Sequence, residues 1–215
     1  MGSCLCGKIT WQISGDILMV SNCHCSMCRK FHGTAYGSYL GVSTEDFEWL
    51  TGEDNIEVYE SSPGGMRPFC KTCGSVVPAV MRDGDSVFMP MGNMEGHIDH
   101  LLDSHIFAAS KAPWFDITDD APQYDGYPPE YEIPGRDNPE RLPETEEAIG
   151  GSCLCGKVRF EFTEAIDRMG YCHCSRCRKA RSSPHSAQLF VKPANFRWTS
   201  GRQHGRFPLT GRRIL

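Results

Sequence analysis

The cysteines of this chain form two patterns, and each pattern occurs twice. One is Cys-x-Cys-Gly, at residues 4–7 and 153–156, and the other is Cys-His-Cys-x-x-Cys-Arg-Lys, at residues 23–30 and 172–179. Each second occurrence lies 149 residues after the first. Thiolates at such short spacings are typical zinc ligands. The chain is therefore predicted to be a zinc protein in which one type of domain occurs twice.

Four cysteines of the first copy come in two pairs. Cys4 and Cys6 are two residues apart, so both side chains point to the same face of an extended segment. Cys70 and Cys73 form a Cys-x-x-Cys followed by Gly74, a zinc-knuckle pattern in which glycine permits a tight turn. Two such pairs predict a closed tetrahedral site. Because a closed site has no coordination position for a substrate, its predicted role is structural.

The other cysteines of the first copy are Cys23, Cys25 and Cys28. Three protein ligands leave a fourth position on zinc for water or substrate, as in catalytic sites. His24 lies between two of these ligands and is expected to face away from the metal as a packed or hydrogen-bonded side chain. The alternative is that His24 closes the site as a fourth ligand. We predict the catalytic arrangement.

Two basic residues, Arg29 and Lys30, directly follow this group. Zinc with three thiolates carries a net charge of about −1, so an incoming thiolate is favoured by nearby positive charge. Arg29 and Lys30 are candidates for binding an anionic substrate, and the alternative is a solvated pair of surface charges. The pattern identifies no general base. His32 is a candidate only because it lies near the basic pair.

The second copy contains only part of this set. A counterpart of Cys70 would fall at position 219, beyond the 215 residues of the chain, so we expect this copy to be incomplete at its C-terminus. Cys153 and Cys155 then form at most half of a structural site, unless another chain or a non-cysteine ligand completes it. We also expect the copy to depend on packing against the first one for its order. Its candidate metal ligands are Cys153, Cys155, Cys172, Cys174 and Cys177.

Short segments of alternating polarity, separated by Gly, Pro, Asp and Asn, predict a mainly β fold. The expected strands are 8–14, 35–42, 47–50, 55–60, 76–80, 87–91 and 106–109, and a short helix is expected at 26–31. Residues 121–149 are rich in Pro, Asp and Glu, as in an extended linker. We therefore expect a complete domain at 1–134, a linker at 135–149 and a partial second domain at 150–215.

The composition, with 40 % hydrophobic and 23 % charged residues, is that of a globular protein. A net charge of −5 argues against nucleic-acid binding. The sequence shows no membrane-spanning apolar run and no secretory signal, so the expected location is the cytoplasm. In that reducing compartment, the twelve cysteines are expected to bind metal rather than to form disulfides.

Taken in order, Gly2–Lys8, Cys23–Lys30 and Phe69–Ser75 resemble the motifs of the glutathione-dependent formaldehyde-activating family, whose members include centromere protein V-like proteins. Gly151–Lys157 and Cys172–Lys179 carry the same resemblance in the second copy. The resemblance implies an Mss4-like zinc-binding β-sheet fold, here duplicated in tandem with the second copy incomplete. It also implies structural and catalytic roles for the groups of four and three cysteines of the first copy.

The leading hypothesis is a zinc-dependent carbon–sulfur lyase acting on thiol adducts of small aldehydes. By resemblance, glutathione and formaldehyde would combine at the three-cysteine zinc to give S-hydroxymethylglutathione. The alternative is a zinc-stabilised protein-interaction module in which both metals are structural, and a third hypothesis is thiol or metal handling. A protein fourth ligand at the three-cysteine site would favour the module, and an exchangeable water would favour chemistry. The oligomeric state is not predicted.

Overall fold

The computed structural model describes residues 1–81, 84–129, 149–163, 166 and 168–201 of the chain. Strands dominate, which confirms the predicted mainly β fold, and the α-helices among the described residues are α1 (Ser26–His32) and α2 (Ser175–Arg181). The helix expected at 26–31 is therefore present. The expected linker at 135–149 lies outside the described residues except for its last residue, so the domain boundaries remain a proposal. Within the described residues, no helix combines the length and apolar character needed to cross a membrane.

The first unit, which we define as the described residues up to 129, contains three sheets. All strand pairs are antiparallel except β10 with β3. The sheets, in strand order, are β1 (Gly2–Ser3), β2 (Thr10–Ile13) and β5 (Phe47–Thr51); β10 (Ser104–Ile106), β3 (Ile17–Cys23), β4 (Gly37–Ser43), β9 (Ser86–Pro90) and β8 (Ala79–Val80); and the pair β6 (Ile56–Glu60) and β7 (Met66–Cys70).

Short 3₁₀ helices connect several of these strands. They are η1 (Thr44–Asp46), η2 (Glu53–Asn55), η3 (Met91–Asn93) and η4 (Ala108–Ser110) in the first unit, and η6 (Pro193–Asn195) further along the chain. Of the residues expected as a strand at 106–109, only Ile106 lies in a strand, as the last residue of β10. Phe107 has a φ of 57°, and the chain turns there into η4. Of the strand expected at 76–80, only Ala79–Val80 forms.

The core of the first unit lies where the three sheets meet. Trp11, Ile9 and Leu40 are fully buried there, together with the thiols of Cys4 and Cys70. Burying each large apolar side chain contributes about 1.5–3 kcal/mol to stability. The packing is tight, since a Cβ atom on Gly2 would lie only 2.4 Å from the Trp11 ring. Two of the four cysteines of the predicted structural site, Cys4 and Cys70, are therefore anchored in the core.

The second unit, which we define as the described residues from 149 to 201, repeats part of this plan. Its first sheet pairs in the order β11-β12-β15, matching β1-β2-β5, and its second pairs β13 with β14, matching β3 with β4. The register is also repeated, since Gly2 pairs with Trp11 and Gly151 with Phe160. The strands are β11 (Ile149–Ser152), β12 (Arg159–Phe162), β13 (Arg168–Cys172), β14 (Ser186–Phe190) and β15 (Phe196–Ser200).

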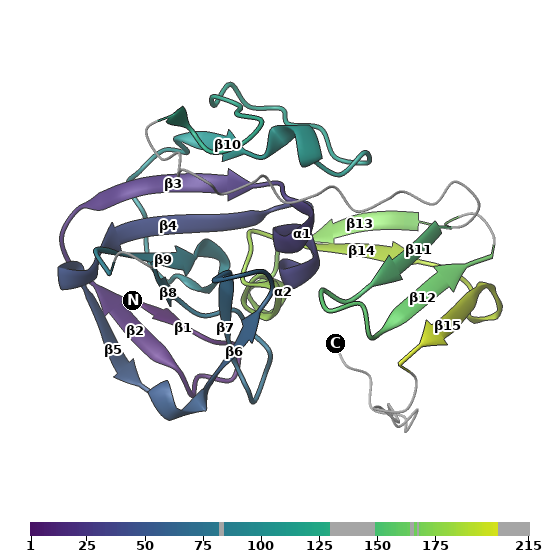
Figure 1. Ribbon diagram of the computed structural model, residues 1–215, viewed down its shortest axis with the longest axis horizontal. Coiled ribbons are helices and arrows are strands. Elements are labelled where there is room, and N and C mark those ends of the chain that lie inside the picture. Colours follow the sequence, from purple (N-terminus) through teal and green to yellow (C-terminus); the bar gives the residue numbers. More distant parts are fainter. Residues whose placement is uncertain (82–83, 130–148, 164–165, 167, 202–215) are drawn as a thin grey trace.

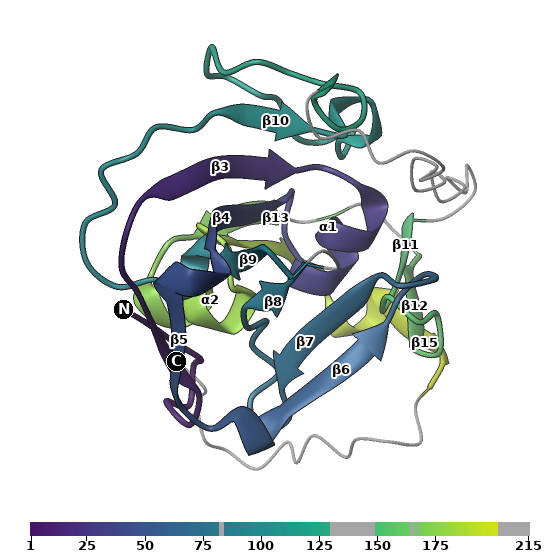
Figure 2. The same cartoon turned by 60° about the vertical axis from the view of Figure 1, so that its left-hand side comes forward.

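The two units are in direct contact. Figure 1 shows α2 near the middle of the molecule, next to elements of the first unit, whereas β11, β12 and β15 lie at the right-hand end. Figure 2 shows the same arrangement from another side, with α2 beneath β4 and β9. Ser182 and Ser183, which follow α2, are completely buried. The segment between α2 and β14 is therefore packed against the first unit, where Ser183 Oγ donates to the Tyr36 carbonyl oxygen at 3.0 Å.

Candidate metal centre

The four cysteines predicted as a structural site come together. The sulfur atoms of Cys4, Cys6, Cys70 and Cys73 all lie within 4.8 Å of one another. Two similar turns position them: the N–H of Gly7 donates to the Cys4 carbonyl oxygen at 3.1 Å, and that of Gly74 to the Cys70 carbonyl oxygen at 2.8 Å. Both glycines have a positive φ, of 75° and 74°, a conformation that glycine adopts without strain. The turn predicted after Cys73 is therefore present.

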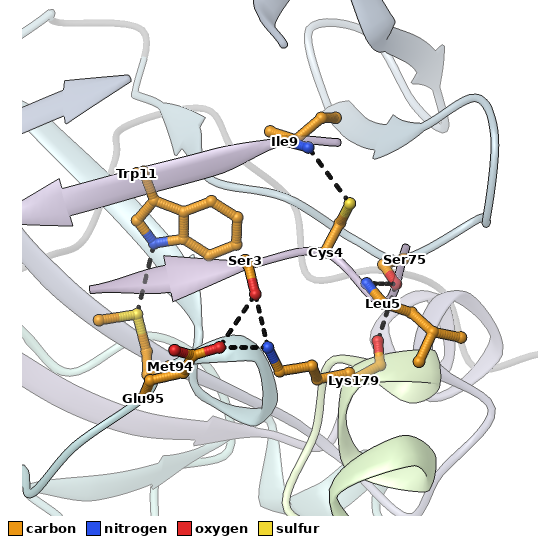
Figure 3. Close-up of polar contacts among 9 residues, drawn as sticks. All are labelled: Ser3, Cys4, Leu5, Ile9, Trp11, Ser75, Met94, Glu95 and Lys179. Atoms are coloured by element: carbon orange, nitrogen blue, oxygen red, sulfur yellow. Dashed lines mark hydrogen bonds and ion pairs between the residues drawn. The ribbon is translucent and has the colours of Figure 1, made fainter. Parts of the chain in front are cut away.

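Polar donors surround these sulfurs. The Ile9 N–H donates to Cys4 Sγ at 3.4 Å, as Figure 3 shows, and Asn55 Nδ2 donates to Cys70 Sγ at 3.0 Å. Burial opposes ionisation of Cys73, but hydrogen bonds with Ser75, Cys6 and Cys70 together outweigh it and lower the pKa of Cys73 to about 6. Four clustered thiols with N–H donors fit a tetrahedral divalent metal such as zinc.

The second group of the first unit is also assembled. The sulfurs of Cys23, Cys25 and Cys28 lie within 4.8 Å of one another, and all three residues are buried. Cys23 ends β3, and Cys25 caps α1 by accepting a hydrogen bond from the Cys28 N–H at 3.3 Å. Among the residues that the structure describes, no further His, Cys, Asp or Glu joins this group. The arrangement supplies three sulfur ligands for a metal.

His24 faces away from the sulfurs, as predicted. Its Nε2 lies 2.8 Å from Nδ1 of His105, whose Nε2 lies 3.0 Å from Asp119 Oδ1. Burial is the main reason why the pKa of His24 falls to about 4, and the neighbouring His105 adds to this effect. His24 is thus a neutral, hydrogen-bonded side chain that helps fix the loop between Cys23 and Cys25.

Arg67 and Tyr39 contact Cys28, and no motif or spacing in the sequence indicates this contact. Arg67 Nη1 and the Tyr39 hydroxyl each lie 3.7 Å from Cys28 Sγ. Arg67 is held by a 2.7 Å hydrogen bond from its Nε to Ser61 Oγ, and its guanidinium lies 5.4 Å from the centre of the Phe31 ring. Hydrogen bonds from the other two cysteines, with help from Arg67, hold the pKa of Cys28 well below its usual value.

The Tyr39 hydroxyl also connects Cys28 to His32. It lies 2.7 Å from His32 Nε2. Burial, and to a lesser extent Cys28, raise the pKa of Tyr39 well above its usual value. A phenol between a sulfur and an imidazole can exchange a proton with either neighbour. His32, proposed from sequence proximity alone, therefore reaches the site through Tyr39.

The structure places Arg29 and Lys30 differently from Arg67. Both lie in α1 and are partly buried. Lys30 Nζ donates to Ser152 Oγ of the second unit. Its charge is therefore engaged between the units, whereas the guanidinium of Arg67 lies at the sulfurs. A role for Arg29 and Lys30 in substrate binding stays a prediction.

The second unit repeats the three-sulfur group in a more exposed form. The sulfurs of Cys172, Cys174 and Cys177 also lie within 4.8 Å of one another, but none of the three residues is buried. Cys153 and Cys155 have their sulfurs 3.4 Å apart. Among the described residues, no other His, Cys, Asp or Glu joins this pair in a group of three or more.

The fold and these sulfur groups define a duplicated, cysteine-rich β protein with metal-binding capacity. Its sequence matches the profile of the family described as glutathione-dependent formaldehyde-activating enzyme over residues 1–110 and 148–209. The match covers more than half of the chain and includes both units. The chain belongs to this family, as the motifs predicted.

Two individual proteins are similar to parts of the chain. An uncharacterized lyase of Schizosaccharomyces pombe, C29B12.13, is 26 % identical over 87 residues, which cover 40 % of this chain and 61 % of that protein. The chain thus spans less than two thirds of this curated relative. A crystal structure of a Rhodobacter sphaeroides protein, a structural genomics target, has a TM-score of 0.38 at 22 % identity, covering 46 % of this chain and 90 % of that chain.

Proposed function

We propose that the protein is a zinc-dependent carbon–sulfur lyase that acts on the adduct of a small thiol, such as glutathione, with formaldehyde. The reaction is an addition without oxidation or reduction. A bond forms between the thiol sulfur and the carbonyl carbon, and the thiol proton ends on the former carbonyl oxygen. The reverse reaction breaks the same carbon–sulfur bond. The family and the name of the yeast relative support this class of chemistry.

The observation that carries the proposal is the buried group of Cys23, Cys25 and Cys28, which no other His, Cys, Asp or Glu of the described residues joins. Three thiol donors fit zinc with one further coordination position. Zinc in this group would lower the pKa of an incoming thiol or polarise the aldehyde oxygen. The four-cysteine group would hold a second zinc with a structural role.

The residues beside the sulfurs suit an anionic substrate. Burial by itself would lower the pKa of Arg67, but Cys28, together with Tyr39 and Cys25, outweighs it and raises this pKa further, so the guanidinium is a permanent cation. It would offset the extra negative charge that a thiolate brings to the three-sulfur group. The Tyr39 hydroxyl would take up the proton that the thiol releases while passing its own hydrogen to His32 Nε2, and the reverse transfer would deliver a proton to the former carbonyl oxygen.

We place this activity in the cytoplasm. Twelve cysteines that serve as metal ligands require a compartment in which thiols stay reduced. The substrates would be small molecules, glutathione and formaldehyde. The second group of three cysteines would bind metal more weakly than the first, because its residues are exposed to competing water.

The test is adduct formation by the zinc-loaded full chain, followed by NMR with ¹³C-formaldehyde and glutathione. We expect the protein to accelerate the exchange between free formaldehyde and S-hydroxymethylglutathione above the uncatalysed rate. We expect Cys28→Ser, which removes a sulfur ligand, to abolish the acceleration. If the full chain binds zinc and gives no acceleration, the alternative of a zinc-stabilised interaction module replaces the lyase.

A further inference from the structure

The contact between the two units is symmetric in its residues. Lys30 Nζ of the first unit donates to Ser152 Oγ of the second, and Lys179 Nζ of the second donates to Ser3 Oγ of the first. Ser152 and Lys179 lie 149 residues after Ser3 and Lys30. Figure 3 shows the second of these contacts, in which Lys179 also reaches Glu95. The two contacts are thus equivalent: in each, the same lysine position of one unit donates to the same serine position of the other unit.

Other pairs join equivalent positions directly. Thr34 Oγ1 donates to Ser183 Oγ at 3.4 Å, and the rings of Tyr36 and His185 have centroids 5.4 Å apart. Each pair has a separation of 149 residues. Contacts of a residue with its own counterpart occur at the twofold axis of a symmetric dimer. The second unit therefore packs on the first in the manner of a partner subunit.

The symmetry fails beside the three-cysteine site. His32 Nδ1 lies 2.7 Å from the carbonyl oxygen of Arg181, the residue at the position equivalent to His32. The second unit has no histidine there to return the bond, and Gln188 stands where the first unit has Tyr39. The residues that link the interface to a cysteine sulfur are therefore present in the first unit only.

The hydrogen bond between His32 and the Arg181 carbonyl oxygen determines which ring nitrogen of His32 carries the proton. A carbonyl oxygen only accepts hydrogen bonds, so Nδ1 of His32 must carry a hydrogen. Burial lowers the pKa of His32 and favours the neutral ring. In a neutral ring with a protonated Nδ1, Nε2 is an acceptor. The Tyr39 hydroxyl is then the donor toward both Nε2 of His32 and Cys28 Sγ, which compete for its single hydrogen.

We propose that the second unit is a built-in partner subunit: the Arg181 carbonyl oxygen holds His32 in the Nδ1–H tautomer, and His32 orients the Tyr39 hydroxyl against Cys28. His32 is a positioning residue here. The proposal rests on the proposed function only in taking the three-cysteine group of the first unit as the working centre. The division of roles explains why the second unit retains its helix and its interface residues without retaining His32 and Tyr39.

The first measurement is the tautomer of His32 in the zinc-loaded full chain, without thiol or aldehyde, from its ring ¹⁵N chemical shifts. The proposal predicts a protonated Nδ1, an unprotonated Nε2 and slow exchange of the Nδ1 proton. A ring protonated only at Nε2 would overturn it. Because no substrate is present, the result does not depend on whether the protein is a lyase.

The second measurement separates the units at a distance from the cysteines. A Cβ atom on Gly92 would lie 2.1 Å from the Ser183 backbone nitrogen, so Gly92→Ala forces the Ser183 segment away from the first unit. Gly170→Ala is the matched control, because no heavy atom lies within 4 Å of its Cβ position. We expect Nδ1 proton exchange at least about tenfold faster in Gly92→Ala, since local opening exposes it, and unchanged in Gly170→Ala. Equal exchange in both variants would contradict the proposal.

A third variant identifies which partner sets the tautomer, and does so even if Gly92→Ala fails to fold. Tyr39→Phe removes the hydroxyl but leaves the Arg181 carbonyl in place. The proposal predicts that His32 keeps the Nδ1–H tautomer in this variant. A change to the Nε2–H tautomer would show that Tyr39, and not the second unit, controls the ring.

Discussion

Arg67 Nη1 lies 3.7 Å from Cys28 Sγ, although 39 residues separate the two in the chain. The strand that brings Arg67 there, β7, ends three residues later at Cys70, a member of the four-cysteine group. One short strand therefore serves both sulfur groups of the first unit. Metal binding by the four-cysteine group would fix the end of β7 and, with it, the guanidinium at the other group.

Arg67→Met tests the role of this guanidinium. A hydrogen bond to a charged group is worth about 1.5–3 kcal/mol, so we expect a loss of about 10- to 150-fold in kcat/KM for adduct formation. Arg168→Met is a matched control, since Arg168 also lies over an aromatic ring, that of Phe190, but on β13 of the second unit. A loss of less than about twofold in Arg67→Met would remove Arg67 from the site.

Cys25→Ala should remove one zinc ion per chain and leave the fold intact. The Cys25→Ala variant of the full chain is expected to bind one zinc ion less than the unsubstituted protein and to lose lyase activity. Metal counting and the adduct assay measure these two effects. Because Cys25 also caps α1, the substitution should cost about 1 kcal/mol of stability. Full activity in this variant would show that the chemistry occurs elsewhere.

Asn55→Ala tests the coupling between the sulfur groups. Asn55 Nδ2 donates to Cys70 Sγ at 3.0 Å, and its Oδ1 accepts from Thr72 Oγ1 at 3.1 Å. Partners of metal ligands typically affect metal affinity by about 10- to 100-fold. We expect this loss at the four-cysteine group in a chelator competition, together with lower lyase activity because β7 carries Arg67. Weaker zinc binding with unchanged activity would show that the two groups are independent.

The ion pair between Lys179 and Glu95 predicts a pH dependence of stability. Hydrogen bonding from Lys179 lowers the pKa of Glu95 in the folded protein. A lowered carboxylate pKa stabilises the fold above the unfolded value of about 4.3, and this contribution disappears as the pH falls through the folded pKa. Glu95 is 55 % exposed on its side chain, so we expect at most about 1 kcal/mol.

Urea unfolding of the full chain and of Glu95→Gln at several pH values measures this contribution. The difference in the free energy of unfolding should be present at neutral pH and should shrink as the pH falls below about 4. Lys179→Met should remove the same pH dependence. A difference that grows on acidification would mean that Glu95 is bound in its protonated form.

The cysteine groups could be predicted from sequence because their members lie at short, repeated spacings. The helix after Cys25 and the glycine turn after Cys73 were also predicted from local rules, and the structure confirms both. These features depend on neighbouring residues. The duplicated plan of the two units could also be predicted, because similar sequences fold alike and the motifs recur at a constant offset of 149 residues.

Features that depend on distant contacts were missed. Strand β3 lies between β10 and β4, and its polar residues are buried because they bond across the sheet, as when Ser38 Oγ donates to Asn22 Oδ1 at 2.6 Å. It therefore lacks the alternation that marks a half-exposed strand. Strand β7 contains Pro68, which argues against a strand in sequence. Arg67 carries no spacing signal, because β7 brings it to Cys28 from another part of the chain.

The most direct test of the account is a crystal structure of the zinc-loaded full chain with anomalous data at the zinc edge. We expect zinc bound by Cys23, Cys25 and Cys28, with water or an added thiol as the fourth ligand and Arg67 beside Cys28. We also expect zinc bound by the four cysteines of the other group. A side chain of the protein as the fourth ligand at the first site, or no zinc there while the second is filled, would contradict the account.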